Sequence, residues 1–408
     1  METRRIGFQA DALLEPQEAL ERYLAAAQLT PPQIEIVQLQ HAAGRILAQD
    51  AAADRMYPAA PRSAMDGFAV RSADLPGRLR IAGEIRMGSV WDGALASGTA
   101  VRIPTGGMLP AGADTVVPIE DAAGLTESDV TLPAAPAGDA VTPAGSDMQA
   151  GETILRAGTT IGPAAAGLLA TLGFSEVRVF RRPVVGVLSS GDELVEAGKP
   201  LGPGQIYDSN RYGIAAALQR MGAEPRHLAT TVDDASALEA ALRKALEVCD
   251  AVVLTGGSSV GERDVTPEVA ARLGEPGVIV HGLRVKPGKP TVLAAAGGKP
   301  VIGLPGNPGS ALTILEMVVR PVFEALAGRA PRPPAGLHAE LQSPLRKRKG
   351  WTWYVPARLD EAVSPAKAYP LELRSSSSSL LARADVLIVL GEEVESLPAG
   401  ATVRVRRL

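Results

Sequence analysis

Acidic residues recur just after the short apolar segments that we expect to be strands. Glu193, Asp233 and Asp264 each follow a different one of these segments. A single acid of this kind would more simply cap a helix or lie in a solvated loop. In an open α/β sheet, however, ligands bind at the carboxyl ends of the strands, so three such acids predict one shared site. Because Mg²⁺ is usually held by one or two carboxylates, waters and substrate phosphates, the pattern indicates a metal-bridged phosphate.

Two lysines lie three residues apart in the stretch RVKPGKPT, Lys286 and Lys289, in a chain with eight lysines. Pro287 and Pro290 stiffen the backbone between and beside them, with Gly288 in the same turn. The alternative interpretation is a solvated charged turn. Because lysine is scarce here, we favour an anion clamp made of two ammonium groups on a rigid loop.

Glycine-rich stretches after three of the expected strands could bind an anion on backbone amides. They contribute Ser190 and Gly191; Gly256, Gly257 and Ser258; and Pro305, Gly306, Asn307 and Pro308. The last group opens a helix, whose free amides favour an anion, although a well-made helix start explains its Asn-Pro pair equally well. The stretch TGGSSVGERD contains neither the G-x-G-x-x-G of a dinucleotide site nor the G-K-[ST] of a P-loop, and its Gly-Gly-Ser-Ser could equally be an ordinary turn.

Three further polar stretches carry weaker signals. Asp66 lies in RSAMDGFAV and Thr105 lies in IPTGGMLPAGAD, and from the residues alone both are candidate loops. The serine run around Ser375 is either a flexible linker or a hydroxyl-rich anion pocket, and composition favours the linker.

The elements that must position these residues fall into blocks of different texture. Residues 15–29 read as a helix, and residues 183–328 alternate strand and helix, which predicts a largely parallel three-layer α/β sheet. Short β-prone runs indicate small β-domains before and after it. The expected domains are 1–50 with 145–180 (mixed α/β, discontinuous), 51–144 (inserted β-domain), 181–328 (α/β) and 336–408 (C-terminal β-domain).

Composition excludes several classes of protein. A hydrophobic content of 46% with 21% charged residues is typical of a soluble globular chain, and a net charge of −4 argues against a nucleic-acid surface. The single cysteine, Cys249, allows no intrachain disulfide, which suits a reducing cytoplasm, and we expect a buried, inert thiol. The sequence shows no zinc-ligand spacing and no stretch that would cross a membrane.

Seven strings occur together in an order that we recognise. They are SAMDGFAV, RIPTGG, SSGDEL, GQIYDSN, TGGSSVGERD, KPGKP and GLPGNPGS, and the pattern resembles the molybdopterin molybdenumtransferase family, which includes the MoeA proteins and the gephyrin E domain. The resemblance implies an elongated four-domain homodimer with a molybdopterin-binding α/β domain and a C-terminal barrel-like β-domain. It implies insertion of molybdenum from molybdate into adenylylated molybdopterin, with Mg²⁺-dependent cleavage of the adenylate and release of AMP. It also implies transient contact with a molybdopterin adenylyltransferase and with molybdoenzyme chaperones.

The resemblance also implies roles for individual residues. The catalytic positions would be Asp66, Thr105, Glu193, Asp233 and Asp264, and the metal ligands Glu193, Asp264 and Asp147. The molybdopterin-binding positions would be Ser190, Gly191, Asp208, Asn210, Gly256, Gly257, Ser258, Lys286, Lys289, Pro305, Gly306, Asn307, Pro308 and Ser375. Phosphate cleavage needs neutralised phosphate charge, which lysines and Mg²⁺ provide.

The chain departs from the family pattern at three places. The arginine-rich run before Asp147 is replaced by VTPAG, Trp351 and Pro356 stand where hairpin arginines are expected, and a Gly-Ser-Gly turn reads Arg374-Ser375-Ser376. Lys347, Lys349 or Arg374 are candidate replacements. Two alternatives therefore stay open: a molybdopterin adenylyltransferase-like enzyme, and a non-catalytic molybdopterin-binding scaffold.

Overall fold

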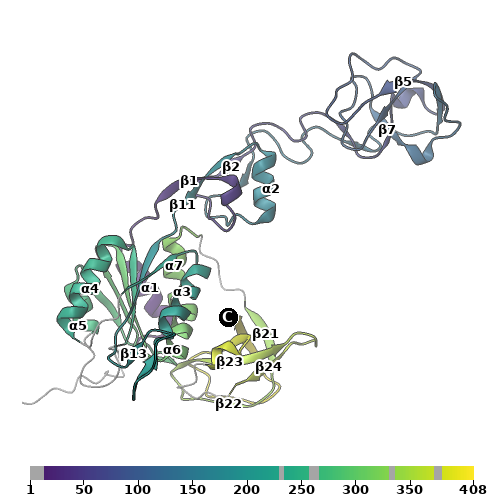
Figure 1. The fold of residues 1–408 in the computed structure, drawn as a ribbon. Coiled ribbons are helices and arrows are strands. Elements are labelled where there is room, and N and C mark those ends of the chain that lie inside the picture. The colour runs from purple at the N-terminus through teal and green to yellow at the C-terminus, as the bar shows by residue number, and fades with distance from the viewer. Residues whose placement is uncertain (1–12, 229–233, 257–265, 330–335, 372–378) are drawn as a thin grey trace, which may run out of the picture. The chain divides into compact units, whose positions relative to one another are not determined.

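The structure is a computed structural model that describes residues 13–228, 234–256, 266–329, 336–371 and 379–408. The chain forms two compact units (Figure 1). The first unit comprises Met1–Ala48, Gly158–Ile161 and Val177–Leu408, and the second unit comprises Gln49–Ala157 and Gly162–Glu176. Within the described ranges, no helix is both long enough and apolar enough to cross a membrane.

The first unit contains the expected α/β sheet. Its strands run in the order β15 (Glu224–His227), β12 (Val184–Ser189), β16 (Ala251–Thr255), β20 (Lys299–Leu304), β19 (Val292–Ala296) and β17 (Pro276–His281). The first four strands are parallel, as predicted. Strand β19 runs antiparallel to both β20 and β17. The two-residue turn Gly297–Gly298 explains the reversal, because both glycines have positive φ (57° and 77°) and so match a tight hairpin.

Helices cover both faces of this sheet, which makes the three layers visible in Figure 1. One face carries α1 (Pro16–Ala26), α3 (Asn210–Arg220), α6 (Pro308–Ile314), the π-helical turn Leu315–Val319 and α7 (Arg320–Leu326). The other face carries α4 (Ala235–Val248) and α5 (Thr266–Arg272). In α4, Leu238, Leu242 and Ala245 recur at helical spacing and are buried, so the apolar stripe of this helix faces the core.

The C-terminal part of the first unit is a barrel, as expected. Its strands are β18 (Val285–Lys286), β23 (Thr352–Asp360), β24 (Lys367–Pro370), β21 (Leu337–Leu341), β27 (Thr402–Arg407) and β25 (Val386–Leu390). Pairing of β25 with both β23 and β27 closes the sheet. Two short strands, β22 (Leu345–Arg346) and β26 (Ser396–Leu397), and helix α8 (Ser379–Ala382) accompany it.

The apolar run VIVHGLRV at 278–285 has the composition of a single strand, but it is divided between two elements. Strand β17 ends at His281, and Gly282 has a φ of 89° that turns the chain. The following residues form β18, which pairs in parallel with β23 of the C-terminal barrel. The loop that carries the lysines is therefore bonded to both the sheet and the barrel.

The segment before the inserted residues pairs with the segment after them. Strand β1 (Ile34–Gln38) pairs with β11 (Glu176–Phe180). Helix α1, in contrast, packs in the α/β core, where the Tyr23 hydroxyl donates to the Ala294 carbonyl at 3.1 Å. The four-domain division itself remains a prediction.

The second unit is mostly β, as expected. Its main sheet has the order β7 (Thr115–Pro118), β4 (Gly67–Val70), β6 (Thr99–Ile103), β5 (Gly77–Glu84) and β8 (Asp129–Leu132). Two short pairs, β3 (Arg62–Ser63) with β9 (Val141–Thr142) and β2 (Ala51–Ala52) with β10 (Thr153–Leu155), and helix α2 (Pro163–Thr171) complete it.

Candidate functional site

Three neighbouring strands of the α/β sheet end in register. Ser189 of β12 lies opposite Thr255 of β16, which lies opposite Leu304 of β20. The predicted site residues Ser190, Gly256 and Pro305 come directly after these positions. The parallel arrangement therefore brings the three predicted loops to one sheet edge.

The loops are in backbone contact at this edge. The Ser190 amide donates to the Thr255 carbonyl at 2.8 Å. Gly256 has a φ of 94°, and a Cβ there would lie 1.9 Å from the Ser190 carbonyl oxygen. A Cβ on Gly306 would lie 3.8 Å from the Gly256 Cα. Only glycine allows the β12 and β16 loops to approach this closely.

The chain between β12 and α3 contributes two buried polar side chains, Asp208 and Asn210, which are 4% and 8% exposed. Two short parallel strands, β13 (Leu194–Val195) and β14 (Ile206–Tyr207), precede them. Asp208 accepts from the Arg211 amide at 3.1 Å, and the Asn210 amide group donates to the Gly306 carbonyl at 2.7 Å.

One oxygen of each side chain, Asp208 Oδ2 and Asn210 Oδ1, has no hydrogen-bond partner among the described residues. A buried acceptor without a partner is costly, so these two oxygens fit a donor or a cation supplied by a ligand.

The lysine loop lies at the same edge. It joins the end of β17 to the start of β19, where Val292 lies opposite Gly303 near the end of β20. Gly288 has a φ of 114°, and a Cβ there would lie 2.2 Å from Ile314 of α6, so this turn packs tightly against α6. Lys286 is exposed, and Lys289 is half-buried.

The predicted acids divide into described and undescribed residues. Glu193 is exposed, and its carboxylate lies over Gly191, where a Cβ would be 2.7 Å from a carboxylate oxygen. Asp233, Gly257, Ser258, Asp264 and Ser375 lie outside the described residues. Among the described residues, no group of three or more His, Cys, Asp or Glu side chains could hold a metal ion.

Two titratable groups show the effect of burial on this unit. Burial lowers the pKa of His227, Arg211 lowers it further, and Asp208 opposes the shift. Cys249 is buried as expected, and burial raises the pKa of its thiol, which makes it unreactive.

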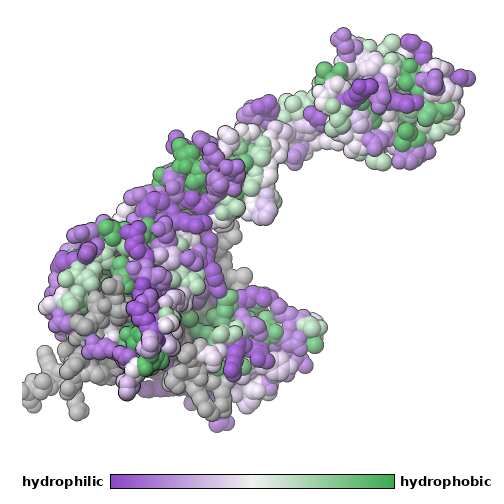
Figure 2. Space-filling model, viewed as in Figure 1, coloured by the Kyte–Doolittle hydropathy of each residue, from purple (hydrophilic) through white to green (hydrophobic). Residues whose placement is uncertain are grey.

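In the second unit, the structure brings Asp66 and Thr105 together. Asp66 Oδ1 accepts from the Thr105 amide at 2.7 Å and from its hydroxyl at 3.1 Å. Two exposed methionines belong to the same segments. Met65 directly precedes Asp66, and Met108 forms an isolated antiparallel β-bridge with Arg62. Figure 2 shows hydrophobic residues among hydrophilic ones on the drawn face of this unit. Asp147 is also exposed here, and its role remains a prediction.

In the C-terminal barrel, one candidate replacement for the missing arginines is already engaged. Lys347 is buried, and its ammonium group donates to the Trp351 carbonyl at 2.6 Å. Burial lowers its pKa, and Glu393 and Glu392 oppose the shift. Lys349 is exposed, and Arg374 lies outside the described residues.

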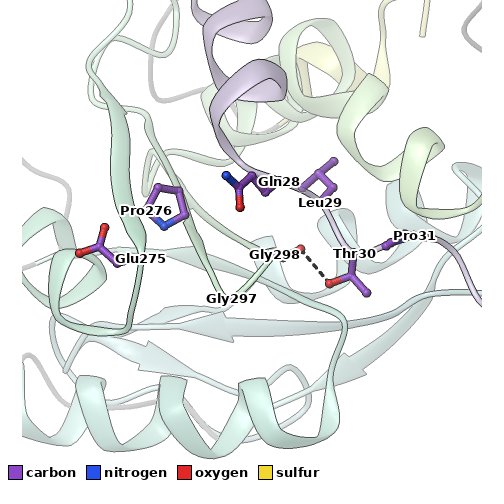
Figure 3. A pocket seen from close by; sticks show the side chains of 8 residues that line it. All are labelled: Gln28, Leu29, Thr30, Pro31, Glu275, Pro276, Gly297 and Gly298. Atoms are coloured by element: carbon purple, nitrogen blue, oxygen red, sulfur yellow. Dashed lines mark hydrogen bonds between the residues drawn. The ribbon is translucent and has the colours of Figure 1, made fainter.

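A pocket of about 540 Å³ lies away from these loops (Figure 3). It is lined by Gln28, Leu29, Thr30, Pro31, Glu275, Pro276, Gly297 and Gly298. Because Gly297 and Gly298 precede β20, the pocket lies at the sheet edge opposite to the end of β20 that holds the site. Its single charged side chain, Glu275, provides no set of groups for phosphate chemistry.

The chain is similar to known protein families over most of its length. Residues 14–173 match the MoeA N-terminal region (domain I and II), residues 186–325 match a probable molybdopterin binding domain, and residues 338–408 match the MoeA C-terminal region (domain IV). A protein of Bacillus subtilis named molybdopterin molybdenumtransferase is 34% identical over 384 residues, covering 91% of this chain and 89% of that protein. The chain belongs to the MoeA family.

Two further MoeA-family relatives agree. A protein of the same name from Haemophilus influenzae is 38% identical over 302 residues, 73% of this chain and 74% of that protein. A crystal structure of the molybdopterin biosynthesis MoeA protein from Pyrococcus horikosii has a TM-score of 0.82 and 33% identity, and the match covers 97% of this chain and 99% of that one. The predicted family and the predicted fold class are thus confirmed.

The site contains one residue that the sequence reasoning missed. The Lys286 ammonium lies 4.3 Å from the centre of the Trp353 ring, and the two residues pair between β18 and β23. Trp353 stands 67 residues further along the chain, in a barrel strand, so no local pattern links it to the lysine loop.

Proposed function

We propose that this chain inserts molybdenum from molybdate into adenylylated molybdopterin, cleaving the adenylate and releasing AMP, in molybdenum cofactor biosynthesis. Membership of the MoeA family supports this reaction, since the curated relatives carry the name molybdopterin molybdenumtransferase. The observation that carries the proposal is the meeting of the β12, β16 and β20 loops with the lysine loop at one sheet edge.

In this proposal the lysine loop neutralises the phosphates. Lys286 and Lys289 would bind the phosphate oxygens. Negative charge builds up on the leaving oxygen as a phosphoanhydride-type bond breaks, so fixed cations stabilise the transition state more than the ground state. Gly256 lets the β12 and β16 loops lie close together at the proposed site. Asp208 and Asn210 offer buried acceptors to ligand donors at the same edge.

Mg²⁺ is the metal that the proposed reaction needs. The unpartnered oxygens of Asp208 and Asn210 are hard donors of the type that this ion prefers, so these two side chains fit part of its ligand shell. Glu193 and Asp264 remain the proposed ligands from the α/β sheet, and the metal-ligand role of Asp147 stays a prediction. When bound, the ion would supply positive charge beside the phosphates.

Release of AMP tests the reaction directly. Purified chain is mixed with adenylylated molybdopterin, Mg²⁺ and molybdate, and AMP and molybdenum-loaded pterin are measured. Formation of both supports the proposal. Absence of AMP would instead support a non-catalytic scaffold. A separate incubation with ATP and molybdopterin tests the other alternative, because adenylylation of molybdopterin without molybdate would support an adenylyltransferase.

Asp264 gives a sharper test of the metal site. Asp264→Asn is expected to keep pterin binding and to lose molybdenum transfer, because the amide removes a negative charge from the proposed ligand set. Full transfer activity in this variant would contradict the role. Asp192→Asn is a suitable control, since Asp192 is an exposed acid beside Glu193 and has no proposed role.

We also propose the assembly and partners that the resemblance implies. The chain would act as a homodimer in the cytoplasm, in transient contact with a molybdopterin adenylyltransferase and with molybdoenzyme chaperones. Measurement of solution mass tests the dimer, and a monomer at micromolar concentration would count against it. Competition between molybdate and tungstate in the AMP assay tests which of the two similar dianions is used.

A further inference from the structure

The exposed side chain of Lys286 rests on an aromatic ring from another part of the chain. Its ammonium nitrogen lies 4.3 Å from the centre of the Trp353 ring, well within the range of a cation–π contact. Lysine has a flexible four-carbon stem, and an exposed ammonium group samples many positions unless something holds it. The ring face offers Lys286 a preferred position without removing any of its three hydrogen-bond donors.

Trp353 is itself held firmly. Its side chain packs against the apolar core of the barrel. The strand that carries it is bonded to the lysine loop on the residue before it, where the Thr352 amide donates to the Arg284 carbonyl at 2.9 Å. The next residue, Tyr354, is 5% exposed and belongs to the α/β core. The backbone of Trp353 is therefore fixed by its neighbours on both sides, and its ring is held by packing on the barrel core.

A salt bridge also joins the lysine loop to the barrel. Arg284 lies two residues before Lys286, and its guanidinium contacts a Glu392 carboxylate oxygen at 3.0 Å. The pairing of Val285 with Thr352 and of Lys286 with Trp353 sets the register between the loop and the barrel. A one-residue shift would pair Lys286 with Thr352 or Tyr354, on the opposite face from the indole, so this register decides whether Lys286 meets the ring.

We propose that Trp353 is a positioning residue for Lys286: the C-terminal barrel holds the lysine of the phosphate clamp in place through this ring. The inference rests on the proposed function, because it gives Lys286 a phosphate to bind. It assigns a part in that site to the barrel, which contains none of the three strand-end loops.

The test is a double-mutant cycle on anion binding by the full chain, with inorganic pyrophosphate as the probe. Binding is measured by calorimetry for the unaltered chain, Trp353→Leu, Lys286→Gln and the double variant. Loss of the ring should weaken binding by about threefold to tenfold when Lys286 is present. The same change should have little effect once Lys286 is replaced, because the ring then has no cation to hold. Trp353→Phe, which keeps a ring, should restore part of the binding.

Trp351→Leu is the matched control. It removes an indole from the same hairpin, but this ring lies near Arg348, 5.9 Å from its centre, and not near Lys286. The expected change in pyrophosphate binding is small. Weakening by Trp351→Leu as large as that by Trp353→Leu would indicate a general effect on the hairpin and would overturn the proposal.

A second readout needs no ligand. After reductive dimethylation of the lysines, ring-current shielding should shift the Lys286 methyl signal in the NMR spectrum, with Lys286→Gln providing the assignment. Trp353→Leu should move this signal and leave the other lysine signals in place. An unshifted Lys286 signal in the unaltered chain, or equal effects of Trp353→Leu with and without Lys286, would overturn the positioning role. Failure of the proposed function would look different. AMP release would then be absent, while Trp353 and Lys286 would still be coupled in pyrophosphate binding.

Discussion

Gly256 provides the most direct test of how the strand-end loops are built. A Cβ at this position would lie 1.9 Å from the Ser190 carbonyl oxygen, so Gly256→Ala forces the two loops apart by more than about 1 Å. The residue also has a φ of 94°, where a side chain costs about 1–2 kcal/mol. Separation of the loops would further weaken the hydrogen bond from Ser190 to Thr255, worth about 1 kcal/mol. Together these terms predict a loss of about 2–3 kcal/mol for the local structure.

Gly198 supplies a control with nearly the same backbone. Its φ is 93°, and nothing lies within 4 Å of a Cβ built there. Gly198→Ala should therefore cost only the conformational term, about 1–2 kcal/mol. The difference between the two variants isolates the close contact at the site.

Hydrogen exchange measured by mass spectrometry on peptides that cover β12 and β16 reports the opening free energy of this strand pair. Gly256→Ala should raise exchange there far more than Gly198→Ala, and it should also abolish pyrophosphate binding. If both variants exchange equally and both bind pyrophosphate, the argument that the loops require glycine at position 256 is refuted.

Three further predictions concern individual side chains. Asn210→Ala leaves the Gly306 carbonyl without its donor and should cost about 1–3 kcal/mol, measured as faster exchange in α3 peptides, whereas unchanged exchange would show the bond to be dispensable. Asp66→Ala removes the acceptor of the Thr105 amide and should lower AMP release while the second unit keeps its circular dichroism spectrum; full activity would remove Asp66 from the site. Because burial lowers the pKa of Lys347, the unfolded chain binds more protons between the lowered value and 10.5. The unfolding free energy should therefore rise with pH in that window, and Lys347→Met should lack this rise; identical pH profiles for the two proteins would contradict the assigned burial effect.

The sequence by itself was enough for the family, the fold class and the strand–helix alternation of the α/β sheet. Apolar periodicity and loop composition are local properties, and the seven strings are local as well, so all of them can be read along the chain. The sequence contains a signal for the antiparallel end of the sheet, because Gly297-Gly298 is typical of a two-residue hairpin turn. The apolar runs on either side of this turn resemble parallel strands, and the prediction of a largely parallel sheet followed them. Strand direction is decided by such turns and not by the apolar runs themselves.

Tertiary structure decided which of these local signals meet. The need for glycine at position 256 comes from the Ser190 carbonyl, 66 residues away. The unpartnered oxygens of Asp208 and Asn210 follow from the burial of these two side chains in the folded chain. The contact between Lys286 and Trp353 depends on the register of two strands from different parts of the fold. Close approach, desolvation and register are relations between distant residues, and only the folded chain establishes them.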